Sequence, residues 1–449
     1  MSVLRLMPRR ILLLGLLGLA LLLPFVTWSQ AALGALLAVL LIACLLPQLD
    51  LDLGKNLTGP PLSRVGPASV DPSTGLVLYP VSALALILIF HHHLDIVAAA
   101  WALMALGDGA ANIAGQALTS RSLPWNPAKT VAGFGAFVAV GVPSALALAL
   151  WTNPALPAGR AFCISALAAL LGAAVESTPV ALDDNLTVPV ATAGFVFCAW
   201  LTARSALDSN LPYLGIRLMV AVAVNLTFAV LALRLRAATR SGAALGFVLG
   251  VLVYLAWGWK SFLILLAFFL LASAATRLGY AQKRARGIAE HHGGARGWRE
   301  ALANVGPGAF FALMVITTHH ERAFLTAFTA AFAEAAGDTV SSEIGQWLAA
   351  DAYLIPSFRR VRAGDNGAVS GVGSGAGLIA AGLIVGLAWG LGLVSAGGAC
   401  LALVTAAAGN LADSLLGSTI ERQRLVTNGV VNFTATALAG ALALALTLR

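Results

Sequence analysis

Two acidic motifs of the same form lie roughly 230 residues apart in strongly apolar sequence. The first begins at Gly107–Asp108 and the second at Gly337–Asp338, and both fit the pattern Gly-Asp-x6-Gly-Gln. A carboxylate inside a bilayer is costly, so such a residue normally marks a functional site with a specific partner. The repetition predicts two related functional sites in one chain.

Helical spacing places each acidic residue of the motifs beside a neutral oxygen. Asp108 and Asn112 are four residues apart, as are Asp338 and Ser342, so each pair shares one helix face. Glu343 lies off that face, and we expect it to point toward a different partner. Mg²⁺ binds one or two carboxylates and completes its shell with water and phosphate oxygens. The motifs therefore predict Mg²⁺ sites that would also accept a phosphate group.

A basic, glycine-bearing stretch follows each acidic motif at a distance of about twenty residues. In the first half it offers an ammonium, a hydroxyl and the free backbone N–H groups of a helix start, which together resemble a phosphate cradle. Neither stretch fits GxxxxGK[ST], so Walker-type ATP binding is not supported. The residues that we expect to bind the phosphates of a nucleotide are Lys129, Thr130, Gly133, Arg360, Gly364, Gly367 and Ser370.

A second acidic segment closes each half of the chain. Phosphoryl transfer needs a metal ion, a basic clamp and a positioned acceptor, and these segments supply further carboxylates for that purpose. The predicted catalytic residues are Asp108, Asp184, Asp338 and Asp413. The predicted metal ligands are Asp108, Asn112, Glu176, Asp183, Asp338, Ser342, Glu343 and Asp413.

Simpler interpretations of several of these residues remain open at this point. Lys129 could be a lysine that extends its ammonium toward water at the membrane edge. Asp183, Asp184 and Asn185 could form a solvated turn that caps a helix. Asp413 could be a charge near a helix N-terminus.

The composition of the chain indicates that these residues belong to a membrane protein. Of 449 residues, 59% are hydrophobic and only 10% are charged, which excludes an ordinary soluble domain and a disordered chain. Apolar runs of membrane-spanning length recur from end to end. We predict an all-α, polytopic integral membrane helix bundle with about fifteen transmembrane helices in two related halves. Two of the expected spans are unusual, because 94–107 is short and 323–350 is long.

A polar segment at 207–212, Leu-Asp-Ser-Asn-Leu-Pro, interrupts the apolar pattern. We therefore expect one membrane domain over residues 1–208 and a second over 212–449. Each domain contains, in the same order, an acidic motif, a basic glycine-bearing stretch and a second acidic segment.

The net charge of +8 is concentrated in a few loops, including one that also holds His291 and His292. The positive-inside rule places these loops on the cytoplasmic side, together with the candidate site loops. We expect an integral protein of a bacterial inner membrane. Nucleic acid is not an expected partner, because no soluble basic domain is present. The loop arginines and lysine are Arg5, Arg9, Arg10, Arg277, Lys283, Arg284, Arg286, Arg296, Arg299, Arg359, Arg360 and Arg362.

Residues 76–206 resemble the polyprenol kinases, a group that includes dolichol and phytol kinases and has cytidylyltransferase relatives. The resemblance lies in Gly107–Gly115, in Pro127–Gly133, in Glu176 and in Asp183–Pro189, the most specific of these segments. This chain has Gly-Asp-Gly-Ala where that group often has Thr or Ala after Gly-Asp.

Residues 212–449 resemble a bacterial and plastid membrane family that includes the plant phytyl-phosphate kinases. The resemblance lies in Gly337–Gly345, Gly364–Ser370, Asp413–Gly417 and Asn428–Phe433. The chain departs from the commoner Gly-Thr-x at 364–366, which leaves the substrate preference of that loop open. Both resemblances imply CTP, or a similar nucleoside triphosphate, as the phosphoryl donor.

Together these features predict a fused, Mg²⁺-dependent membrane kinase. The first half would phosphorylate an isoprenoid alcohol such as phytol, farnesol or geranylgeraniol, and the second would convert the prenyl monophosphate to the diphosphate. Both substrates would lie in the bilayer, among membrane lipids. The alternatives are a one-reaction prenol kinase or cytidylyltransferase with one degenerate half, and a lipid-phosphate transporter, since repeats and buried carboxylates also occur in transporters. Clustering of the motifs at one membrane face favours the enzyme.

Overall fold

The computed structural model describes residues 18–56, 72–180, 182–289, 294–349, 351–355 and 357–448. Arg5, Arg9 and Arg10, the beginning of the first expected span, and the pair His291–His292 lie outside these residues. The described chain is almost entirely helical, with two very short sheets, which confirms the predicted all-α class.

Eleven helices of the described residues are long and apolar enough to cross a membrane. The chain is therefore a polytopic membrane protein, while the predicted count of about fifteen spans is not confirmed. The short span expected at 94–107 belongs to a helical stretch that runs from Leu94 to Ala117. The long span expected at 323–350 corresponds to α14 (Glu321–Leu348), which is not among the eleven. Its acidic side chains make it more polar than the others, and most of α14 is buried among neighbouring helices.

The chain divides into two compact units, residues 1–200 (unit 1) and residues 201–449 (unit 2). The polar segment at 207–212 forms part of the first turns of α9 (Arg204–Arg234), where most of its side chains are exposed.

Unit 1 surrounds a helix that is broken by a π-helical turn just before the first acidic motif. Its sheet is a two-stranded antiparallel hairpin. The elements are η2 (Leu23–Phe25), α2 (Trp28–Asn56), α3 (Pro72–Ile89), α4 (Leu94–Ala102), the π turn η3 (Leu103–Gly107), α5 (Asp108–Ala117), β1 (Ser122–Leu123), β2 (Asn126–Thr130), α6 (Val131–Thr152), α7 (Ala158–Glu176) and α8 (Asp184–Leu201).

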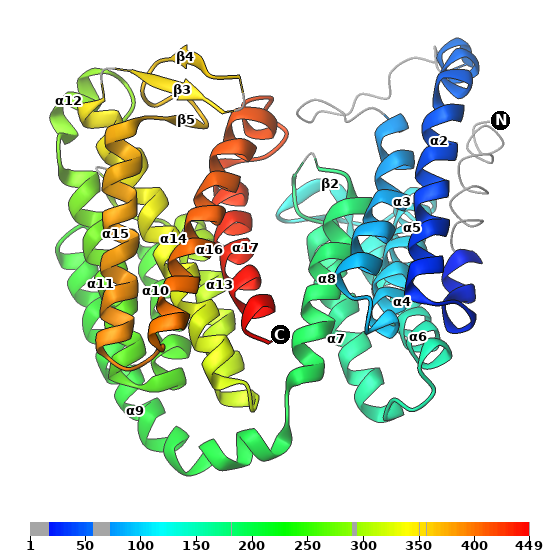
Figure 1. The fold of residues 1–449 in the computed structure, drawn as a ribbon, viewed down its shortest axis with the longest axis horizontal. Coiled ribbons are helices and arrows are strands. Elements are labelled where there is room, and N and C mark those ends of the chain that lie inside the picture. Colours follow the sequence, from blue (N-terminus) through cyan, green and yellow to red (C-terminus); the bar gives the residue numbers. More distant parts are fainter. Residues whose placement is uncertain are drawn as a thin grey trace. The chain divides into compact units, whose positions relative to one another are not determined.

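Unit 2 surrounds α14, which packs against α11, α13, α15, α16 and α17 (Figure 1). Its antiparallel sheet has the strand order β4-β3-β5. The other elements are α10 (Arg240–Trp257), α11 (Trp259–Arg277), α12 (Tyr280–Ala285), α13 (Trp298–Thr317), β3 (Ala352–Leu354), β4 (Arg359–Val361), β5 (Ala368–Val369), α15 (Gly371–Gly390), α16 (Ala396–Leu416), the π turn η5 (Gly417–Glu421) and α17 (Asn428–Thr447).

Glycines bring the helices of unit 1 close together around the acidic motif. A Cβ added at Gly115 would lie 3.3 Å from Thr130 Oγ1, and one at Gly133 would lie 3.1 Å from the carbonyl oxygen of Ala111. Thr130 is the N-cap of α6 and accepts a hydrogen bond from Gly133 N at 3.1 Å. The acidic helix α5 and the helix that follows the hairpin are therefore in close backbone contact.

The same contact recurs in unit 2 at equivalent positions. A Cβ added at Gly345 would lie 3.0 Å from Ser370 Oγ, and one at Gly373 would lie 2.5 Å from the carbonyl oxygen of Ser341. Ser370 is the N-cap of α15 and accepts a hydrogen bond from Gly373 N at 3.1 Å. Counted from the acidic residue of each motif, the glycines on the two acidic helices match. Each unit thus joins an acidic helix, a short β segment and a capped helix in the same way.

Candidate functional site

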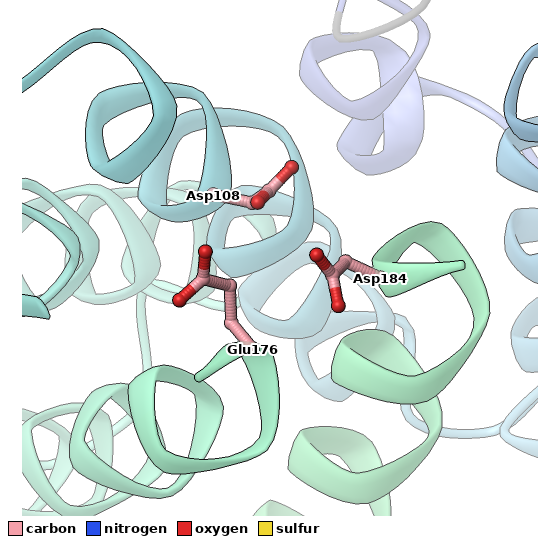
Figure 2. Close-up of side chains that lie close together, drawn as sticks. All are labelled: Asp108, Glu176 and Asp184. Carbon is pink, nitrogen blue, oxygen red and sulfur yellow. The ribbon is translucent and has the colours of Figure 1, made fainter. Parts of the chain in front are cut away.

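Three carboxylates from three helices converge in unit 1. Asp108 is the first residue of α5, Glu176 is the last of α7, and Asp184 is the first of α8. One oxygen from each lies within 4.8 Å of the other two. Figure 2 shows the three side chains turned toward a common space between the helices. The donor set consists only of carboxylate oxygens, which is the type that hard divalent cations such as Mg²⁺ prefer.

The ammonium of Lys129 lies in the same cluster. Its Nζ donates a hydrogen bond to Glu176 Oε1 and a second one, of 3.2 Å, to Asp184 Oδ2. The side chain of Glu176 is 4% exposed, whereas those of Lys129 and Asp184 are 27% and 30% exposed. Burial lowers the pKa of Lys129, but the charges of Asp184 and Glu176 outweigh it and leave the pKa above its ordinary value. Lys129 is thus a charged member of the cluster.

The hairpin β1–β2 is anchored to the end of the helix that carries Glu176. Trp125 Nε1 donates to Ser177 Oγ at 3.2 Å, and Asn126 Nδ2 donates to Ser177 O at 3.1 Å. Ala128 N in turn donates to Asn126 Oδ1 at 3.1 Å, which shapes the strand leading to Lys129. Contacts between the hairpin and Ser177, the residue after Glu176, therefore help to position Lys129 beside the carboxylate of Glu176.

Two further predicted ligands have different surroundings. Asn112 Nδ2 donates to Asp108 Oδ1 at 2.9 Å, so the two residues share one helix face as predicted. Asp183 Oδ1 instead accepts hydrogen bonds from Asn185 N at 2.9 Å and Asn185 Nδ2 at 2.7 Å. Asp183 therefore orders the turn before α8 and is not one of the three converging carboxylates.

The predicted phosphate cradle at the start of α6 differs from the sequence expectation. The N–H groups of Val131, Ala132 and Gly133 donate to Arg121 O, Ser120 Oγ and Thr130 Oγ1, at 2.9, 3.1 and 3.1 Å. The expectation that these backbone groups are free was therefore wrong, because the hairpin and the cap already satisfy them. Nucleotide contacts by Thr130 and Gly133 remain a prediction.

In unit 2 the acidic motif meets Asp413, which is among the predicted metal ligands. The side chains of Asp338 and Asp413 are hydrogen-bonded to each other, and Ser342 is hydrogen-bonded to Asp338 as well. Asn432 Nδ2 lies 3.4 Å from Asp338 Oδ2. Two carboxylates in contact repel each other, so the Asp338–Asp413 pair needs a proton or a cation to stabilise it.

Glu334 is a buried acidic residue that the sequence reasoning missed. It lies one helical turn before Asp338 and is 1% exposed. Thr436 Oγ1 donates to Glu334 Oε2 at 2.6 Å, and Gly409 leaves room for the side chain, since a Cβ there would lie 2.8 Å from Glu334 Cγ. The i,i+4 spacing from Asp338 was the signal that could have revealed it.

Three buried oxygens around Asp338 have no hydrogen-bond partner within the described part of the chain. They are Glu334 Oε1, Asp413 Oδ1 and Asn432 Oδ1, and they come from α14, α16 and α17. Buried polar atoms are nearly always satisfied in proteins. Orphaned oxygens beside a pair of carboxyl groups are compatible with a bound cation.

Glu343 does not join this cluster. Its Oε2 accepts a hydrogen bond of 2.5 Å from Lys283 Nζ, and Lys283 also donates to the carbonyl oxygens of Ala275 and Thr276 at 3.3 and 3.0 Å. Lys283 is fully buried. The pair fastens the short helix α12 to α14, which is a different partner for Glu343, as its position off the Asp338 face predicted.

The polar loop between β4 and α15 lies against the π turn η5. Gly364 and Gly367 have φ values of 101° and 70°, which favour glycine. A Cβ at Gly367 would lie 2.0 Å from the backbone nitrogen of Ser418 in η5. The structure therefore places this loop close to the end of α16, the helix that carries Asp413.

The other two residues predicted to bind nucleotide in unit 2 already have partners. Arg360, on β4, forms an ion pair with Asp351. Ser370 caps α15 and is buried against Gly345. Of the two, only Arg360 is exposed, and its contact with phosphates remains a prediction.

Comparison with known proteins identifies the family. The model of an integral membrane family, DUF92, matches residues 223–440, which lie within unit 2. An uncharacterized membrane protein of Synechocystis is 34% identical over 200 residues, covering 44% of this chain and 78% of that protein. The chain belongs to the DUF92 family.

Other relatives of this DUF92 protein come from an archaeon and a plant. An uncharacterized membrane protein of Methanocaldococcus jannaschii is 31% identical over 228 residues, or 50% of this chain and 92% of that protein. Protein VTE6, a chloroplastic protein of Arabidopsis thaliana, is 33% identical over 221 residues, or 47% of this chain and 66% of that protein. No solved structure matches the chain.

Proposed function

We propose that this protein catalyses two successive CTP-dependent phosphorylations of an isoprenoid alcohol. Unit 1 phosphorylates the alcohol, and unit 2 phosphorylates the resulting prenyl monophosphate to the diphosphate. The observation that supports the proposal is the repeated scaffold, in which the equivalent residues Asp108 and Asp338 each lie beside further carboxyl groups.

In unit 1, Asp108, Glu176 and Asp184 fit a Mg²⁺ ion by their donor atoms and their mutual distances of no more than 4.8 Å. When bound, this ion would neutralise charge on the transferring phosphoryl group. Lys129 supplies the basic clamp, since its ammonium reaches the same cluster from the hairpin. Asp184 is the carboxylate of choice for orienting the substrate hydroxyl, because it is more exposed than Glu176.

In unit 2, Asp338 and Asp413 are the corresponding residues, with Ser342 and Asn432 beside them. The substrate of this unit already carries a phosphate and is more negative than an alcohol. The exposed arginines that precede the glycine loop suit that difference, because they add positive charge near the site. They are Arg359, Arg360 and Arg362.

The comparisons support the second reaction more directly than the first. The DUF92 match covers residues 223–440, the region whose motifs resemble plant phytyl-phosphate kinases, and a chloroplast protein is among the relatives. The first reaction rests on the resemblance of 76–206 to polyprenol kinases and on the cluster around Lys129.

A bilayer location is consistent with such a pair of reactions. Eleven described helices can span the membrane, so both substrates and the monophosphate intermediate can stay in the lipid while their polar ends reach the clusters. The candidate loops are proposed to face the cytoplasm, where the nucleotide is available. The candidate prenols are phytol, farnesol and geranylgeraniol.

The test is incubation of the purified protein in detergent micelles with γ-labelled CTP, ATP, GTP or UTP and a panel of prenols and prenyl monophosphates. Reactions with Mg²⁺ are compared with reactions in EDTA. The proposal predicts labelled mono- and diphosphates from CTP and Mg²⁺. A protein that forms no product from any pair would favour a lipid-phosphate transporter, which needs a sealed compartment. Transfer of a cytidylyl group, detected in a parallel reaction with α-labelled CTP, would instead identify a cytidylyltransferase.

A further inference from the structure

The two acidic sites differ at one position of their shared scaffold. Lys129 directly precedes the capping residue Thr130 in unit 1, whereas Val369 directly precedes the capping residue Ser370 in unit 2. The β segment of unit 1 therefore delivers an ammonium group to its carboxylates, whereas the equivalent position in unit 2 holds a half-buried apolar residue.

This ammonium and a divalent cation compete for the same oxygens. Lys129 Nζ is hydrogen-bonded to Glu176 Oε1 and lies 3.2 Å from Asp184 Oδ2. A Mg²⁺ ion bound to these oxygens would lie about 2.1 Å from each. Such an ion would come into close contact with the ammonium, and the two positive charges would repel each other in a partly buried space. Lys129 must leave the carboxylates before a divalent cation can enter.

Within the described residues, no lysine is paired with the main carboxyl groups of unit 2, and the positive charge that acts on Asp338 is the guanidinium of Arg296. Asp338 and Asp413 contact each other directly. The orphaned oxygens Glu334 Oε1, Asp413 Oδ1 and Asn432 Oδ1 lie around them. A divalent cation can gain these ligands without displacing a lysine.

On the basis of the proposed function, we propose that the two sites acquire their divalent cation in different orders. Unit 2 binds the cation by itself. Unit 1 binds it only when nucleotide phosphates draw the Lys129 ammonium away from Glu176 and Asp184. Lys129 has a flexible stem and is 27% exposed, so its ammonium can turn toward phosphates arriving from outside. This order would keep the alcohol site inactive until a nucleotide is present.

The experiment counts Mn²⁺ ions bound to the purified full chain by electron paramagnetic resonance, with Mn²⁺ as the probe for Mg²⁺. Without nucleotide, the wild type should bind one ion and Lys129→Met should bind two, with affinity at unit 1 raised about ten- to hundredfold. Lys129→Gln is a second variant in case one of them folds poorly. Lys260→Met is the control, because Lys260 Nζ donates to Leu391 O, just past the end of α15 opposite to Ser370.

Asp338→Asn assigns the ions to the units. This variant should bind none without nucleotide, and one when a non-hydrolysable CTP analogue is added. The Asp108→Asn/Asp338→Asn double variant should not bind the ion that appears with the CTP analogue.

Two ions on the nucleotide-free wild type would overturn the proposal, as would no additional ion in either Lys129 variant. Retention of the ion by Asp338→Asn would overturn the assignment to unit 2. Product formation is measured separately, so loss of the ordered binding and loss of the kinase activity are distinguishable results.

Discussion

Replacement of Gly367 by alanine should disable unit 2 while leaving unit 1 active. Gly367 has a φ of 70°, and an added Cβ would lie 2.0 Å from Ser418 N, 2.5 Å from Ser418 Cα and 2.6 Å from Gly417 C. The left-handed conformation costs a non-glycine residue about 1–2 kcal/mol. Overpacking adds about 1–3 kcal/mol. The sum, about 2–5 kcal/mol, exceeds what a short surface loop can absorb in place, because the neighbours are backbone atoms.

The loop of the Gly367→Ala variant should therefore separate from η5. A displacement of about 1 Å at a catalytic site can reduce a rate about a hundredfold. We expect that loss in the conversion of prenyl monophosphate to diphosphate, measured by product separation over time, with unchanged alcohol phosphorylation. Gly371→Ala is the matched control, because a Cβ there meets nothing within 4 Å and Gly371 lies in α15. Wild-type diphosphate formation and wild-type thermal unfolding in Gly367→Ala would refute the close contact with η5.

Two further predictions concern buried polar contacts of unit 2. Thr436→Val removes the donor to Glu334 and should lower the free energy of unfolding by about 1–3 kcal/mol in chemical denaturation. Thr434→Val, at an exposed site, is the control and should change the free energy of unfolding little. Equal effects of the two substitutions would contradict the buried contact. Lys283→Met leaves Glu343 buried and unpaired, which should cost about 3–5 kcal/mol. Much of that loss should be recovered in the double variant Lys283→Met/Glu343→Leu, measured by thermal unfolding. A double variant that is no more stable than Lys283→Met would argue against the ion pair.

The sequence was sufficient for features set by helix periodicity and composition. The recurrence of apolar runs predicted the all-α membrane class. The four-residue spacing correctly placed Asp108 beside Asn112 and Ser342 beside Asp338, because those contacts lie within one helix. Asp413 was predicted, like Asp338, to be a metal ligand, and the structure places the two side chains in contact.

Helix periodicity and composition could not predict the contacts that depend on how separate segments pack against each other. Glu343 was also among the predicted metal ligands, but α12 brings Lys283 to it from a distant loop. The N–H groups at the start of α6 were expected to be free, but a hairpin that the sequence did not predict supplies Ser120 and Arg121 as their partners. The predicted count of about fifteen spans is not confirmed, since eleven described helices have the length and hydropathy of a span and α14, with its buried acidic side chains, is not among them.

The most direct test of the two-site account is the product distribution of two single variants supplied with a prenol, CTP and Mg²⁺. Asp338→Asn should accumulate prenyl monophosphate, because the cluster of unit 1 is intact. Asp108→Asn should form no product from the alcohol but should still convert added monophosphate to diphosphate. Asp208→Asn, at an exposed position on α9, is the control and should behave like the wild type. Loss of both reactions in either folded variant, or diphosphate formation at the wild-type rate by Asp338→Asn, would contradict the assignment of one reaction to each unit.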